Sequence, residues 1–113
     1  MTNDHPIEVS LTERGSTLLV QVAGELDLAT SPQLREEVED VDWDEMKRVV
    51  FDLLEVEFMD SSGLGVLIAL REEHPETEIA LVADGDGLVT KVLRLTAMEE
   101  LFPIHSSTEA ALA

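Results

Sequence analysis

The sequence predicts an α/β fold: a single domain in which a mixed β-sheet of four to five strands is flanked by helices. The length of 113 residues suits one hydrophobic core. Apolar residues make up 44% of the chain, as in globular proteins. After two opening strands, segments with helical spacing alternate with short apolar runs, which favours a sheet layered with helices. No repeat or linker divides the chain, so we expect one domain over residues 1–113, with its core at about 6–105.

The opening of the chain predicts a β-hairpin. Apolar and polar residues alternate from Ile7 to Leu11, which is the period of a half-buried strand. A turn at 14–16 leads to a second strand at 17–23, which ends in the Gly-Glu-Leu-Asp sequence at 24–27. Strands joined by so short a turn pair antiparallel.

The first helix is expected to begin near Pro32. Either Thr30 and Gln33 form a capping box, or Ser31 caps the helix with Pro32 at its first position. The apolar residues that follow at helical spacing form the buried stripe of this helix: Leu34, Val38 and Val41.

The rest of the chain alternates between buried strands and helices. Residues 48–54 form a short, nearly continuous apolar run, as expected for a central strand covered on both faces. The further elements follow in order: a loop at 59–63, a helix from 64 to about 73, a strand at 78–83, a break at 84–87, a helix from 88 to about 101 that Pro103 stops, a short strand from Ile104, and a helical turn at 108–113.

The charge of the chain restricts its partners. The formal net charge is −18, so we expect no nucleic-acid partner, and an anionic membrane surface is disfavoured. The acids serve either solubility or the binding of a basic protein. Seven of them lie between residues 36 and 45 without any base, which is typical of a solvated face. Dense like charge also predicts a monomer when the protein is free.

The chain has no cysteine, which excludes a disulfide framework, a thiolate metal site and a cysteine nucleophile. The N-terminal residues show neither the basic nor the apolar region of a signal peptide. The longest apolar run, at 64–70, is far shorter than the ~20 residues that span a bilayer. These features predict a cytoplasmic protein.

The segment at 58–68 combines hydroxyl groups with an unusually apolar helix. Asp60, Ser61 and Ser62 are all favourable N-cap residues. The residues at 64–70 lack the polar face that a surface helix needs. Two interpretations stay open: a buried helix with a serine cap, or an exposed hydroxyl beside an apolar docking patch.

The sequence Phe-Met-Asp-Ser-Ser-Gly-Leu-Gly-Val at 58–66 closely resembles the phosphorylation-loop signature of the STAS domain family, specifically of the bacterial anti-sigma factor antagonists. Most of the remaining chain resembles the same family. Residues 24–27, with Pro32 and Leu34, resemble the second strand and first helix of the family. Residues 49–53 resemble its central strand, and residues 93–104 resemble its C-terminal segment. Ala97 is a departure, because many members have glycine there, and this bears on the end of the third helix.

This resemblance implies a regulatory switch rather than an enzyme. In the family, the unphosphorylated antagonist binds an anti-sigma factor that is also a serine kinase of the histidine-kinase-like ATPase type, which frees the sigma factor. The kinase phosphorylates the serine that corresponds to Ser61, the antagonist is released, and a serine phosphatase resets it. The expected partner-binding residues are Asp27, Asp60, Ser61, Ser62, Gly63 and Leu64, and we expect no cofactor or metal. The alternative is a STAS subunit of a stress-signalling scaffold or of a membrane lipid transporter.

Several side chains keep two possible roles at this point. Asp60 either positions the Ser61 hydroxyl or caps the helix. Asp27 either contacts the partner, as the resemblance implies, or accepts hydrogen bonds from turn amides. Leu64 and Val66 are either core residues or docking residues.

Other chemistry is not supported by the residues present. A serine hydrolase would need a Gly-x-Ser-x-Gly elbow, which the segment around Ser61 lacks. Asp52 lacks the acidic pair of a phospho-aspartate receiver, and 84–87 is expected to be a turn rather than a calcium loop. The remaining predictions are plain surface positions for the histidines and a core-covering role for the tryptophan: His5, His74, His105 and Trp43.

Overall fold

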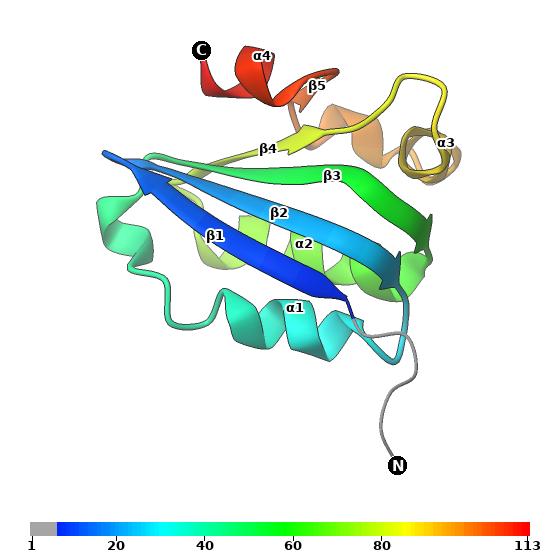
Figure 1. Ribbon diagram of the computed structural model, residues 1–113, viewed down its shortest axis with the longest axis horizontal. Helices are drawn as coiled ribbons and strands as arrows, with labels where there is room; N and C mark the ends of the chain where they lie inside the picture. Colours follow the sequence, from blue (N-terminus) through cyan, green and yellow to red (C-terminus); the bar gives the residue numbers. More distant parts are fainter. Residues whose placement is uncertain (1–6) are drawn as a thin grey trace.

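The computed structural model describes residues 7–113. A five-stranded sheet with strand order β1-β2-β3-β4-β5 forms its centre (Figure 1). The first two strands pair antiparallel, and every later pair is parallel, so the predicted mixed sheet and opening hairpin are confirmed. The strands are β1 (Glu8–Arg14), β2 (Thr17–Leu26), β3 (Arg48–Met59), β4 (Glu78–Val82) and β5 (Ile104–His105).

Helices cover both faces of the sheet. The helices are α1 (Ser31–Glu37), α2 (Ser61–Glu73), α3 (Leu88–Leu95) and α4 (Thr108–Leu112), with two short 3-10 helices, η1 (Trp43–Glu45) and η2 (Met98–Glu100). Figure 1 shows α1 and α2 against one face and α4 against the other. The main core joins the inner sides of α1, α2 and α3 to the sheet, and a smaller cluster lies under α4. Within residues 7–113, no helix combines the length and the apolar character that a membrane crossing requires.

The strand β3 has the two-sided burial that its apolar run predicts. Val49, Phe51 and Leu53 belong to the main core, whereas Val50 belongs to the cluster under α4. Successive side chains of a strand point to opposite faces, so both faces of this strand are covered.

Two strands run further than their apolar runs predict. β2 continues to Leu26 through a bulge at Gly24, whose φ of 110° favours glycine. β3 continues to Met59, because the exposed acids Glu55 and Glu57 flank a buried Val56. The predicted ends at 23 and 54 are therefore too early, and the extra residues bring the ends of both strands toward the same helix.

Neither of the two caps left open for α1 is present. Thr30 occupies the N-cap position but makes no side-chain cap, and Ser31 is the first residue of the helix rather than its cap. The Asp27 carboxylate instead accepts hydrogen bonds from the amides of Ala29 and Thr30. Gln33 does not reach back to the cap, because its side-chain amide donates to the Ile7 carbonyl.

The third helix ends earlier than its spacing predicts. α3 stops at Leu95, and Ala97 takes a left-handed conformation with φ of 58°. A left-handed residue cannot continue a right-handed helix, so the chain leaves α3 there and resumes as η2. Ala97 thus lies just past the end of α3, in a conformation that favours glycine.

The aromatic residue Trp43 covers the core as predicted. Its indole is buried and donates a hydrogen bond to the Val38 carbonyl. The prediction for His74 is incomplete, because its half-buried ring stacks on Trp43 with centroids 3.9 Å apart. His105 is half-buried on β5, and His5 lies outside the described residues.

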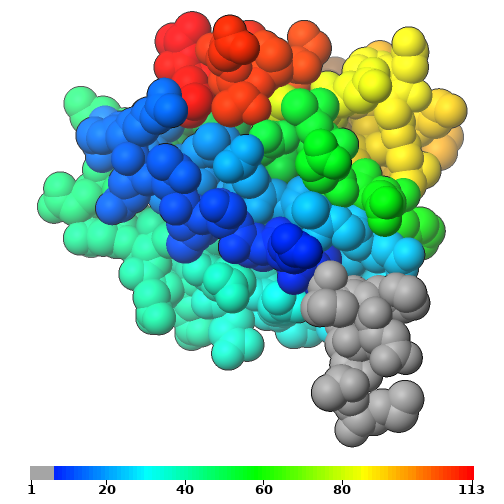
Figure 2. Space-filling view, viewed as in Figure 1, coloured from blue at the N-terminus to red at the C-terminus, as the bar shows by residue number. Residues whose placement is uncertain are grey.

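One long edge of the sheet is open. Figure 2 shows β1 uncovered across this face, next to α1 and the segment that follows it. Six of the seven residues of β1 are exposed, so the helix layer covers little of this strand.

Candidate functional site

The two motifs that carry the resemblance meet at one edge of the sheet. Leu26, at the end of β2, pairs with Met59 at the end of β3. The Asp60 amide then donates a hydrogen bond to the Leu26 carbonyl at 3.2 Å. The carboxyl ends of parallel neighbours lie at the same edge, so the turn after β2 and the turn after β3 become neighbours.

The Asp60 turn, residues 60–63, leads directly into α2. The Asp60 carboxylate accepts hydrogen bonds from the amides of Ser62, at 2.8 Å, and Gly63, at 3.4 Å. The predicted loop at 59–63 is therefore wrong from Ser61 onward, because the capping carboxylate starts the helix there. Of the two roles left open for Asp60, capping is the one that the geometry shows.

The Ser61 side chain is exposed at the first position of α2. Among residues 7–113, its hydroxyl makes no hydrogen bond, and the neighbouring turn amides donate to Asp60 instead. The neighbouring Ser62 is half-buried. Ser61 is therefore the more accessible nucleophile of the pair.

The residues beneath this turn are packed tightly. Gly63 is buried, and a Cβ added there would lie 2.7 Å from Leu26 Cγ and 2.9 Å from the Leu26 carbonyl oxygen. Leu64 is only 4% exposed and belongs to the main core. Val66 is half-buried against the same core. The core role left open for these two side chains is confirmed, and Leu64 offers no exposed patch.

The Asp27 turn, residues 27–31, is held by its own side chains. The Asp27 carboxylate accepts hydrogen bonds from two turn amides at 3.0 and 3.1 Å, so the turn-acceptor role is confirmed. The Thr30 hydroxyl donates to the Glu25 carbonyl at 2.6 Å and accepts from the Asp27 amide. The Ser31 hydroxyl donates to the Asp27 carbonyl at 2.5 Å.

Two exposed apolar side chains near the turns are not predicted from the sequence as candidate binding residues. Leu28, in the Asp27 turn, is 77% exposed, and Phe58, two residues before Asp60, is 44% exposed. Period-two alternation would place Phe58 and Met59 on opposite faces, and only Met59 is buried. This alternation predicts an exposed Phe58 only when β3 is known to extend to Met59.

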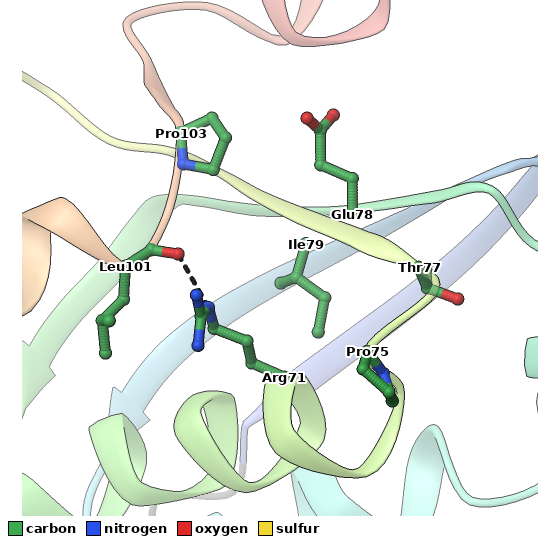
Figure 3. A pocket seen from close by; sticks show the side chains of 7 residues that line it. All are labelled: Arg71, Pro75, Thr77, Glu78, Ile79, Leu101 and Pro103. Atoms are coloured by element: carbon green, nitrogen blue, oxygen red, sulfur yellow. Dashed lines mark hydrogen bonds between the residues drawn. The ribbon is translucent and has the colours of Figure 1, made fainter.

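The Ser61 side chain is exposed at the protein surface. A cavity of about 310 Å³ lies elsewhere, between the end of α2, β4 and the segment before β5. There the Arg71 guanidinium donates a hydrogen bond to the Leu101 carbonyl at 2.9 Å (Figure 3). Within the described part of the chain, no group of three or more histidine or acidic side chains could hold a metal ion. The geometry at Ser61 suits contact with a macromolecule better than enclosure of a small ligand.

The chain is similar over nearly its whole length to two known proteins. The chain is 29% identical over 107 residues to an anti-sigma-B factor antagonist of Staphylococcus aureus, covering 91% of this chain and 96% of that protein. It is 28% identical over 113 residues to an anti-sigma-F factor antagonist of Mycobacterium tuberculosis, covering 99% and 92% of the two chains.

A solved structure is similar at the level of the backbone. The crystal structure of an anti-sigma factor antagonist from Mycobacterium paratuberculosis has a TM-score of 0.83 and 32% identity, covering 94% of this chain and 91% of that one. The sequence model of the STAS domain matches residues 8–111, which include both turns and all five strands. The chain therefore belongs to the STAS domain family.

Proposed function

We propose that this chain is an anti-sigma factor antagonist that acts as one domain over residues 1–113. The unphosphorylated form binds an anti-sigma factor, which is also a serine kinase of the histidine-kinase-like ATPase type, and thereby frees the sigma factor. Phosphorylation of Ser61 ends the binding. The names of the similar proteins support the class of function. The observation that carries the switch is the exposed Ser61 hydroxyl at the start of α2.

The binding surface is the edge formed by the two turns. Asp27, Asp60, Ser61 and Ser62 supply its polar groups, and the exposed Leu28 and Phe58 supply apolar area. Because such surfaces combine an apolar centre with a polar rim, this composition fits a protein partner. The buried Gly63 and Leu64 contribute by holding the Asp60 turn in place.

The chemical step is a phosphoryl transfer to the serine. The Ser61 Oγ attacks the γ-phosphorus of ATP held by the kinase, the bond from that phosphorus to the β,γ-bridging oxygen breaks, and ADP leaves. A base of the kinase takes the hydroxyl proton. The chain is the substrate of this reaction, and we propose no enzymatic activity of its own.

Release follows from the added charge. A phosphate adds about −1.5 to −2 charge at neutral pH. The amides of Ser62 and Gly63 already donate to Asp60, so the phosphate gains these donors only by displacing that carboxylate. The helix dipole still tolerates the charge, so we expect the fold to stay nearly unchanged. A partner that needs a neutral, dry surface loses about 3 kcal/mol, or roughly 100-fold in affinity.

A serine phosphatase that acts on phospho-Ser61 returns the chain to its binding form. We further propose that the free chain is a cytoplasmic monomer without direct nucleic-acid or membrane contacts. Its net charge of −18 disfavours self-association and anionic partners.

The test is affinity capture from the source organism, with partners identified by mass spectrometry. Four baits are compared: wild type, Ser61→Ala, Ser61→Asp and Ser106→Asp. Ser106 is an exposed serine after β5, so its variant adds the same charge away from the site. We expect Ser61→Ala and Ser106→Asp to retain a histidine-kinase-like ATPase and Ser61→Asp to lose it.

Two results would count against the proposal. If all four baits capture the same transporter or scaffold subunits, Ser61 is not a release switch, and the alternative function replaces the proposed one. If a crystal structure of Ser61→Asp shows a rearranged core, release does not arise from local charge.

A further inference from the structure

An apolar groove lies at the open edge of the sheet, between β1 and the segment that follows α1. Its volume is about 410 Å³, and its apolar lining consists of the exposed Leu11 and the half-buried Val41, with the buried Leu18 beneath them. Leu11 is 42% exposed, although it belongs to a strand of the central sheet. Figure 2 shows β1 and this segment next to each other on one face of the molecule.

The groove exists because α1 is short. Leu11 pairs with Val20, and Val20 is fully buried in the core that α1 and α2 cover. Leu11 therefore points to the helix-bearing face. α1 ends at Glu37, and the chain turns away before it covers this part of β1. The fold thus leaves an aliphatic side chain uncovered on a face that is buried elsewhere.

The rim of the groove carries a single sign of charge. Four carboxylates line it, and none of its lining residues is basic: Glu13, Glu37, Asp40 and Asp42. The ion pairs found within residues 7–113 use other acids, namely Glu73, Glu78 and Glu99. An apolar floor inside an acidic rim is complementary to aliphatic side chains flanked by lysine or arginine.

We propose that this groove binds a basic amphipathic segment of a protein partner. Aliphatic side chains of the segment cover Leu11 and Val41, above the buried Leu18, and its cationic side chains meet the four carboxylates. This mode is the helix-in-groove recognition of an amphipathic helix. Three of the seven acids at 36–45, namely Glu37, Asp40 and Asp42, then have a binding role in addition to solubility.

The groove is remote from Ser61. Leu18 and Leu26 are eight positions apart on β2, which corresponds to roughly 26 Å at about 3.3 Å per residue. The Asp60 turn is bonded to the Leu26 end. Screening over such a distance leaves little effect of charge at Ser61 on the groove. The proposal therefore does not depend on the switch at Ser61.

The test titrates the protein with a synthetic peptide of leucine and lysine in helical amphipathic spacing, at about 0.15 M salt. A peptide of the same composition in scrambled order is the control. Backbone amide shifts measured by NMR report the site of binding. We expect the patterned peptide to shift the amides of the groove residues and the scrambled peptide to bind at least about tenfold more weakly.

Two variants distinguish binding in the groove from a general attraction of the cationic peptide to the negatively charged protein. Leu11→Lys places a cation in the groove, whereas Leu95→Lys makes the same change at a residue of α3 that is 87% exposed. We expect Leu11→Lys to weaken binding at least about tenfold and Leu95→Lys less than about twofold. Equal weakening by both variants, or equal binding of both peptides, overturns the proposal.

A second pair keeps the test decisive if Leu11→Lys fails to fold. Glu37→Gln with Asp40→Asn removes two rim charges, and Glu72→Gln with Glu100→Gln removes two exposed charges elsewhere. Only the first pair should weaken binding, by about fivefold or more, and equal effects contradict the groove. Ser61→Asp should bind the peptide as wild type does, whether or not it loses a partner in affinity capture.

Discussion

The two turns at the carboxyl edge of the sheet are built alike and differ in their hydroxyl groups. Each follows a strand of the parallel pair β2 and β3, and each begins with an aspartate whose carboxylate accepts hydrogen bonds from two backbone amides. In the Asp27 turn, the Thr30 and Ser31 hydroxyls are buried and bonded to carbonyls. In the Asp60 turn, Ser61 is exposed and makes no such bond within residues 7–113.

This difference shows how one motif, an aspartate that accepts hydrogen bonds from the amides after it, serves two purposes. When the hydroxyls that follow the aspartate are buried, they fix the turn and are not available for chemistry. In the Asp60 turn the carboxylate alone caps the helix. The Ser61 hydroxyl is not needed for the cap and stays accessible. The predictions below test this contrast, beginning with the substitution of largest expected effect.

The strongest test of the Asp60 turn as a fixed element is Gly63→Ala. The added methyl group would meet Leu26 Cγ at 2.7 Å and the Leu26 carbonyl at 2.9 Å, and a carbonyl in a paired strand cannot move aside cheaply. We expect a loss of about 2–3 kcal/mol in the free energy of unfolding, measured by urea denaturation.

Gly65→Ala is the matched control. It lies in the same helix two positions later, and nothing lies within 4 Å of its added Cβ. Alanine is the better helix former, so we expect a gain of about 0.5–1 kcal/mol. If both variants are stabilised, the Asp60 turn can shift away from β2, and its rigid placement beside the Asp27 turn is disproved.

The Asp27 turn is tested by Thr30→Val, which keeps the shape of the side chain and removes its hydroxyl. The change leaves the Glu25 carbonyl and the Asp27 amide without their side-chain partner in a site only 1% exposed. We expect a loss of about 2 kcal/mol in urea denaturation. Thr12→Val on the exposed β1 is the control and should change stability by less than about 0.5 kcal/mol. Equal effects of the two variants would mean that the Thr30 hydroxyl does not fix the turn.

The sequence identifies the edge but not the contacts that distinguish its two turns. The apolar run of β3, the hairpin and the helix behind Asp60 depend on local patterns, and the structure confirms them. The spacing of Thr30 and Gln33 is also a local pattern, and it fits a capping box. The structure instead has the Gln33 side chain bonded to the Ile7 carbonyl, 26 positions away. Such a long-range contact depends on how α1 docks on β1, which no local pattern encodes.

The same limit explains the end of α3 and the exposure of Ser61. Apolar spacing continues past Leu95 because η2 also packs against the core, so only the left-handed Ala97 marks the break. The serine is a good cap by residue type, and so is Asp60. The end of β3 decides whether Asp60 or Ser61 caps α2. The sequence pattern places that end at residue 54, whereas β3 continues to Met59.

The smallest predicted effect decides whether the contrast between the hydroxyls is real. Ser31→Ala removes a buried hydroxyl that donates to the Asp27 carbonyl at 2.5 Å, and we expect a loss of about 1 kcal/mol in the free energy of unfolding. Ser61→Ala removes an exposed hydroxyl, and we expect a change below about 0.5 kcal/mol. Both are serine-to-alanine changes at the start of a helix, so differences in helix propensity cancel between them. If Ser61→Ala costs as much as Ser31→Ala, the Ser61 hydroxyl is held by the fold. A kinase would then have to break that contact before transfer, and the free hydroxyl would no longer distinguish the two turns.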